Sequence, residues 1–129
     1  YAHFGLGEPE RAFAFAERTL DRAFRRRSVI GQIDALYQYG RLLRHRGDAA
    51  SMELSRRALL HGYTLARRIG ARPRAPLFLM ELVGVARHAG NEALAQRLKR
   101  RAVRELVRVE AVGFVRRLAA GVPRRPPQA

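Results

Sequence analysis

Residues 42–54 read LLRHRGDAASMEL, and this stretch ends one helix and begins another. Before it, apolar residues recur every three or four positions over residues 28–46, which predicts a helix rather than a strand. Gly47 marks a turn, and Asp48 is a favourable N-cap for a second helix that should stop at Gly70. The stretch therefore predicts two helices joined by a tight turn.

A glycine followed by residues that favour the start of a helix also occurs before and after this pair of helices. Gly7 precedes Glu8 and Pro9, which suit a first helical turn, and Gly90 precedes Asn91, a good N-cap. Further helices are predicted over 77–89, opened by Pro76, and from Asn91 to about residue 118. No stretch favours a strand, so the fold class is all-α. Residues 121–129, GVPRRPPQA, are predicted to be a disordered tail rich in proline and arginine.

The three turn glycines lie at a long period, with spacings of 40 and 43 residues. Placing Gly7, Gly47 and Gly90 in register aligns three sets of residues on the helices that follow. These sets are Ala12, Met52 and Ala95, then Leu20, Leu60 and Val103, and then Ala23, Tyr63 and Leu106. The repeating unit is a helix, a tight turn at glycine, and a longer helix.

This unit resembles the tetratricopeptide (TPR) repeat family, in which a small residue such as Gly40 allows close helix packing. The resemblance implies α-α hairpins stacked as a short right-handed superhelical solenoid over residues 1–120, with the first unit truncated. Each unit exceeds the family period of about 34 residues, and Ala16, Arg56 and Lys99 stand where a large aromatic is usual. Longer units of this kind are similar to divergent arrays in multidomain bacterial regulators of signal transduction, which implies a cytoplasmic protein. An alanine-, leucine- and arginine-rich helical bundle that imitates the pattern is the alternative.

The composition is strongly basic. The 129 residues carry a formal net charge of +15, and Lys99 is the one lysine among 26 basic residues. Such a charge attracts nucleic acid or acidic protein, although a GC-rich coding sequence produces the same arginine bias without any ligand. The chain has no cysteine, and no apolar run approaches the roughly 18 residues of a membrane span. A membrane partner is therefore not expected.

Residues suited to catalysis are sparse. No glycine-rich phosphate loop occurs, and the serines have no histidine and aspartate context. His45 and His88 occupy equivalent positions in the last turn of a predicted helix, which favours a structural role over metal binding. We expect no enzyme activity, cofactor or metal in this segment.

One polar strip interrupts the apolar surface of the helix over 28–46. Its residues are Asp34, Gln38, Arg41 and His45, and the repeat register maps them onto Leu77, Glu81, Gly84 and His88. In a TPR-like stack these helices line the concave surface, so Asp34, Gln38, Arg41, His45, Glu81 and His88 form a candidate protein-binding groove. A solvated face is the alternative. Arg41 and Glu81 are expected to pair or to share a ligand.

A second candidate surface is a basic stripe on the last long helix, within an arc of about 100°. It consists of Arg97, Arg100, Arg101, Arg104 and Arg108, and the apolar Leu94, Ala95, Leu98, Ala102, Leu106 and Val109 lie on the other side. The stripe could follow a phosphate backbone, or it could be the polar outer face of a terminal repeat. The matching positions of the preceding unit are not basic, which favours the second interpretation.

These observations predict a non-catalytic interaction module, a regulatory scaffold segment of a larger bacterial protein. Its expected partner is a protein or peptide, which includes another domain of the same chain. The alternative is a basic helical-repeat domain that binds DNA or RNA through phosphate contacts. The identity of the partner cannot be inferred from the sequence.

Overall fold

The computed structural model describes residues 8–70 and 73–121, with side chains from residue 10 onward. These residues form five α-helices and no strand, so the predicted all-α class is confirmed. The predicted turn at Gly7 and nearly all of the predicted tail lie outside the described residues. The helices are α1 (Glu8–Arg25), α2 (Val29–Arg46), α3 (Ala49–Arg68), α4 (Ala75–His88) and α5 (Glu92–Ala119).

Side-chain caps begin three of the helices. Ser28, Asp48 and Asn91 precede α2, α3 and α5, and each side chain accepts the backbone N–H three residues further on, over 3.1, 3.0 and 3.1 Å. Each bond satisfies one of the donors that the first helical turn leaves unpaired. The two caps predicted beside the turn glycines, Asp48 and Asn91, are therefore confirmed.

The turns use the left-handed conformation where the sequence offers glycine. Gly47, Gly70 and Gly90 have φ of 77°, 77° and 76°, which residues with a β-carbon adopt only at an energetic cost. The turn between α1 and α2 has no glycine, and Arg27 takes φ of 54° there instead. That conformation costs roughly 1–2 kcal/mol for a residue other than glycine.

Helix α4 begins differently from the sequence prediction. It starts at Ala75, before Pro76, and Arg74 precedes it without a side-chain cap. The Arg74 guanidinium instead lies 3.0 Å from the carboxylate of Asp34 on α2. This contact joins the start of α4 to α2.

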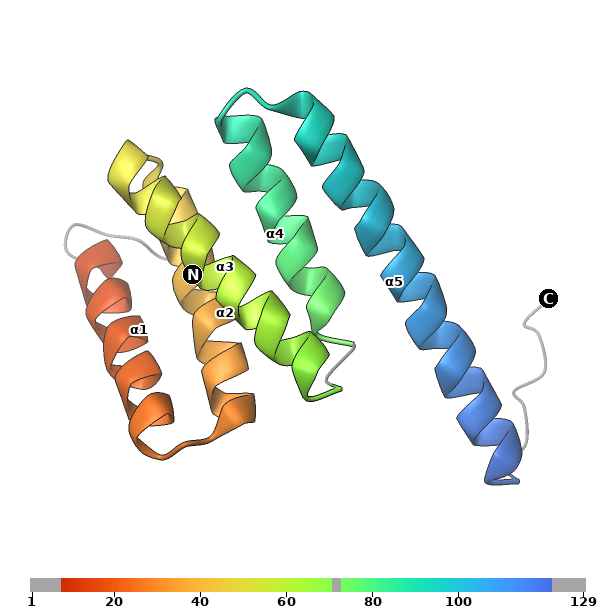
Figure 1. Ribbon diagram of the computed structural model, residues 1–129. Coiled ribbons are helices and arrows are strands. Elements are labelled where there is room, and N and C mark those ends of the chain that lie inside the picture. Colours follow the sequence, from red (N-terminus) through yellow and green to blue (C-terminus); the bar gives the residue numbers. More distant parts are fainter. Residues whose placement is uncertain (1–7, 71–72, 122–129) are drawn as a thin grey trace.

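The helices pack antiparallel to their neighbours in chain order, from α1 to α5 (Figure 1). One further pair, α2 and α4, is in contact although α3 separates the two in sequence. The last turns of α5 extend beyond α4 and stand away from the other helices (Figure 1). This arrangement brings α2 and α4 into contact with each other.

The main core lies between α2, α3 and α4. Its most enclosed large side chains are those of Ile33, Leu59, Phe78 and Leu79. Smaller clusters join α1 to α2 around Phe13 and Leu43, and α4 to α5 around Val83, Ala86 and Ala95.

The close approach expected at Gly40 is confirmed. A β-carbon built on Gly40 would lie 2.6 Å from Leu59 Cδ2, so α2 and α3 meet there without room for a side chain. The hydroxyl of buried Ser55 donates to the Gly40 carbonyl over 2.7 Å at the same crossing. Gly62 has a similar place on α3, directly against the ring of Phe78 on α4.

The alignment at the three turn glycines predicts burial correctly at some positions and not at others. Met52 and Ala95 are buried as aligned, but Leu60, Val103 and Leu106 are exposed. Next to the aligned pair Leu60 and Val103, the buried residues are Leu59 and Ala102, one position earlier in each helix. Leu106 lies on the predicted apolar side of α5, but α5 has by then passed beyond most of α4.

Candidate functional site

The candidate groove residues follow the contact between α2 and α4. Four of them come from α2 and two from α4, and we call this set the α2–α4 strip. Its members are Asp34, Gln38, Arg41, His45, Glu81 and His88. Because α2 and α4 touch, the structure brings together two parts of the set that are far apart in sequence.

Glu81 is the centre of the strip. Its side chain is only 12% exposed, and Arg41 Nε lies 3.1 Å from Oε1, so the predicted pairing of Arg41 with Glu81 is confirmed. The other carboxylate oxygen accepts a hydrogen bond from Arg44 Nε over 2.9 Å and has Arg44 Nη2 at 2.7 Å. Two guanidiniums therefore meet one carboxylate, which leaves a local excess of positive charge.

Sequence reasoning missed Arg44. The signal for it lies on the opposite helix, where Gly84 leaves the space that this guanidinium needs. A β-carbon built on Gly84 would lie 3.0 Å from Arg44 Nη1. The repeat register aligned Gly84 with Arg41 as an equivalent position, and it gave no sign that Gly84 faces Arg44.

Tyr37 closes one side of this ionic cluster. Its ring packs edge-on against Phe78 with 5.5 Å between centroids, and the Arg41 guanidinium lies 5.5 Å from the centroid of the same ring. Burial raises the pKa of the Tyr37 hydroxyl, and the negative charge of Glu81 raises it further. The phenol is therefore neutral near pH 7 and can both donate and accept hydrogen bonds.

The remaining strip residues lie toward the two ends. Asp34 is exposed and pairs with Arg74, whereas Gln38 is exposed between Asp34 and Arg41. His45 and His88 are exposed in the last turns of α2 and α4, as predicted. In the described ranges, no three His, Asp or Glu side chains are grouped so that they could hold a metal ion.

All five arginines of the basic stripe on α5 are exposed. Arg101 is also engaged with Glu105, at 3.3 Å, and with the ring of Tyr63 on α3, whose centroid lies 5.5 Å away. The stripe is therefore presented to solvent, and one of its members joins α5 to α3.

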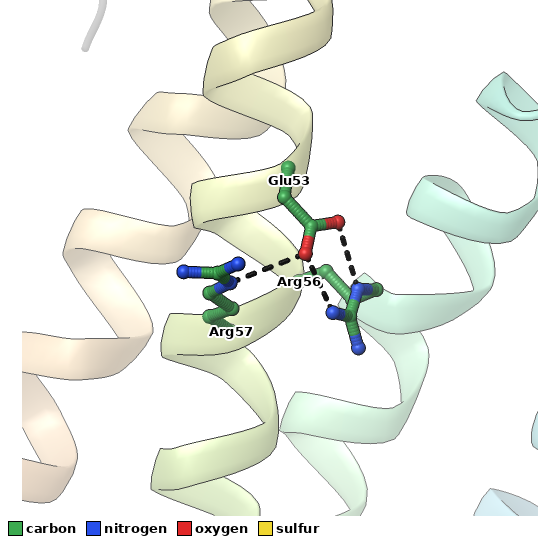
Figure 2. Close-up of polar contacts among 3 residues, drawn as sticks. All are labelled: Glu53, Arg56 and Arg57. Atoms are coloured by element: carbon green, nitrogen blue, oxygen red, sulfur yellow. Dashed lines mark hydrogen bonds and ion pairs between the residues drawn. The ribbon is translucent and has the colours of Figure 1, made fainter.

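Another ionic cluster lies on α3 alone. Figure 2 shows the Glu53 carboxylate between the guanidiniums of Arg56 and Arg57, at 2.6 and 3.2 Å. The hydrogen bond from Arg56 and its positive charge, together with those of Arg57, lower the pKa of Glu53 to about 2. All three side chains are exposed, so we interpret this cluster as part of a solvated helix face.

The α2–α4 strip is suited to recognition by hydrogen bonds. With the adjoining Arg44 and Tyr37, it combines guanidinium donors, a carboxylate that holds them in place, and a phenol on an aromatic pair. No family model, curated protein or solved structure matches the chain. Across the described helices, none is long and apolar enough to cross a membrane.

Proposed function

We propose that the chain is a TPR-like helical-repeat segment that binds a protein or peptide on the α2–α4 strip. In this proposal α2 and α4 are the first helices of successive units, and α3 and α5 are the second helices. The contact between α2 and α4, across an intervening helix, supports a stacked array of hairpins. The glycine turns at Gly47 and Gly90 begin the second helix of each unit.

The observation that carries the proposal is the cluster at Glu81. A purely solvated face would present long, mobile side chains, but here Arg41 and Arg44 are held by a mostly buried carboxylate. Fixed donors lose less conformational entropy when a partner binds, so they favour recognition. The segment then acts as an interaction and regulatory scaffold, without chemistry of its own.

A displayed library of random peptides tests this proposal. Peptides selected on the wild-type chain are synthesised, and their affinity is measured at about 150 mM salt, where the Debye length is about 8 Å. The double variant Gln38→Ala, Arg41→Gln should weaken binding about tenfold or more, because each lost charge-assisted hydrogen bond contributes roughly that factor. Glu81 keeps its ion pair with Arg44 in this variant, so we expect the fold to be retained, and helical circular dichroism checks this.

The matched control removes charge elsewhere. The variant Arg100→Gln, Arg104→Gln, Arg108→Gln changes exposed residues of α5 and leaves Arg101 in its contact with Tyr63. Peptide affinity should change less than about twofold if the α2–α4 strip is the binding surface. Loss of binding in the α5 variant, with normal binding in the α2 variant, would reject the proposal.

Binding of DNA or RNA is the second candidate function, and the five exposed arginines of the α5 stripe favour it. Contacts to phosphate would make the affinity fall with salt, with a log–log slope of about −0.9 for each phosphate neutralised on duplex DNA. We expect a duplex of about 20 base pairs to bind at low salt and to dissociate by about 150 mM. A tight complex at that salt concentration, lost in the α5 variant, would make nucleic-acid binding the better account.

A further inference from the structure

A cleft separates the end of α3 from the C-terminal half of α5, on elements that the α2–α4 strip does not use. Its volume is about 290 Å³, close to the lower limit of small-molecule sites. Arg67, Gly70 and Pro73 form one wall, at the end of α3 and in the following loop. The other wall belongs to α5, which at this height has left α4 (Figure 1).

The walls carry more positive than negative charge. Arg67, Arg108 and Arg116 line the cleft, and Glu105 is the one carboxylate among the lining residues. Glu105 is already engaged, because it accepts the Tyr63 hydroxyl over 2.6 Å and lies 3.3 Å from Arg101, which is outside the cleft lining. The lining therefore has a surplus of at least two positive charges.

The three arginines differ in how they are held. Arg67 donates to the Tyr63 hydroxyl over 3.2 Å and lies 5.7 Å from the centroid of that ring, so its guanidinium is fixed at the rim. Arg108 and Arg116 form no ion pair within the described part of the chain, and both are exposed. One fixed donor and two adjustable donors can converge on a single anion.

The remaining lining is apolar. Pro73, Val109 and Val112 contribute hydrocarbon, and Gly113 contributes no side chain at all. A β-carbon built on Gly113 would meet only the flexible end of Arg117, at 3.5 Å. Gly113 therefore leaves space in the cleft that a larger residue would occupy.

We propose that this cleft binds a small organic phosphate monoester with a compact apolar body. A phosphate monoester carries a charge of about −1.5 to −2 at pH 7, which matches the surplus on the walls. Guanidiniums bind its oxygens in a bidentate manner, and the valines and proline cover the organic group. The volume admits a short chain or one ring and excludes a lipid with two acyl chains.

Calorimetry with hexyl phosphate at about 150 mM salt tests the proposal. Inorganic phosphate supplies the anion alone, and hexanol supplies the apolar body alone. Each buried methylene adds about fourfold to affinity, so hexyl phosphate should bind at least about tenfold more tightly than either. Equal affinity for inorganic phosphate, or binding only to vesicles that contain phosphatidic acid, would overturn the proposal.

Two variants and one control locate the site. Gly113→Leu fills the cleft while improving the helix propensity of α5, and it should weaken hexyl phosphate binding at least about tenfold. Arg108→Gln, Arg116→Gln should have a similar effect through the lost charge. Arg97→Gln, Arg100→Gln removes the same charge from α5 outside the cleft and should change affinity less than about twofold. Wild-type affinity in Gly113→Leu, with the helical circular dichroism intact, would contradict this site.

Discussion

Gly62 shows at the scale of one residue how tightly this molecule is packed. Gly62 faces Phe78, which is only 1% exposed, so no solvent-filled space is available to the ring if it must move. The local sequence does not predict this close contact, because a glycine inside a helix usually only lowers helix stability. The contact depends on the helix that lies opposite.

Gly62→Ala should therefore destabilise the protein by about 1–3 kcal/mol, the usual range for overpacking a core. Gly113→Ala is the matched control, because its new methyl group meets only Arg117. That change should raise the free energy of unfolding by up to about 1 kcal/mol through helix propensity. Urea denaturation followed by circular dichroism measures both, and equal stability of the Gly62→Ala and wild-type chains would contradict the packing described here.

Glu53 gives a prediction that depends on pH. Its pKa in the folded chain is about 2, below the ordinary value of 4.5, so the folded state binds fewer protons than the unfolded state between these values. The contribution of Glu53 to stability is therefore present above about pH 4.5 and is lost as the pH falls through about 2. Titration of the Glu53 carboxyl by NMR should give a midpoint near 2, and the variant Arg56→Gln, Arg57→Gln should bring it back toward 4.5.

The helices illustrate, at the scale of elements, which features can be predicted from sequence. Caps such as Asp48 and Asn91 act on backbone groups three residues away, so the local sequence contains all the information needed. Pro76 lies in the first turn of α4 as predicted, but the helix begins at Ala75, two residues before the predicted start, and no side-chain cap marks that residue. Arg27 likewise takes a left-handed turn that no glycine signals.

In the candidate site, too, some contacts could be predicted from the sequence and others could not. The pairing of Arg41 with Glu81 could be predicted because the repeat register places both on corresponding helices. The part played by Arg44 could not, because a long side chain turns toward whatever space the neighbouring helix leaves, here at Gly84. The contact of Arg101 with Tyr63 could not be predicted either, because it depends on how α3 packs against α5.

Glu81 connects α2 to α4, so replacing its carboxylate should destabilise the protein. Glu81→Gln should lower the free energy of unfolding by roughly 1–3 kcal/mol, because two partly buried guanidiniums lose their carboxylate. Glu53→Gln is the control, since Glu53 also binds two arginines but does so on an exposed face of one helix. The control should lose clearly less stability, because its ion pairs are exposed to solvent, and equal losses in both variants would contradict the structural role of Glu81.

At the scale of the whole molecule, the two candidate surfaces for a macromolecular partner lie apart on the described helices, so an experiment can tell them apart. Glu81 holds Arg41 of the α2–α4 strip and the adjoining Arg44, whereas the arginines of the α5 stripe are exposed. Net charge alone cannot choose between these surfaces, because a charge of +15 attracts any polyanion at low salt. The location of the bound partner can.

An NMR map of the chain, saturated with a peptide selected from the library at about 150 mM salt, tests this account most directly. The amide and guanidinium signals that shift should cluster on the α2–α4 strip, at Gln38, Arg41, His45 and Glu81, and at the adjoining Arg44. Signals of Arg97, Arg100 and Arg104 should stay in place. Shifts confined to α5, with the Glu81 cluster unchanged, would contradict the proposed binding surface.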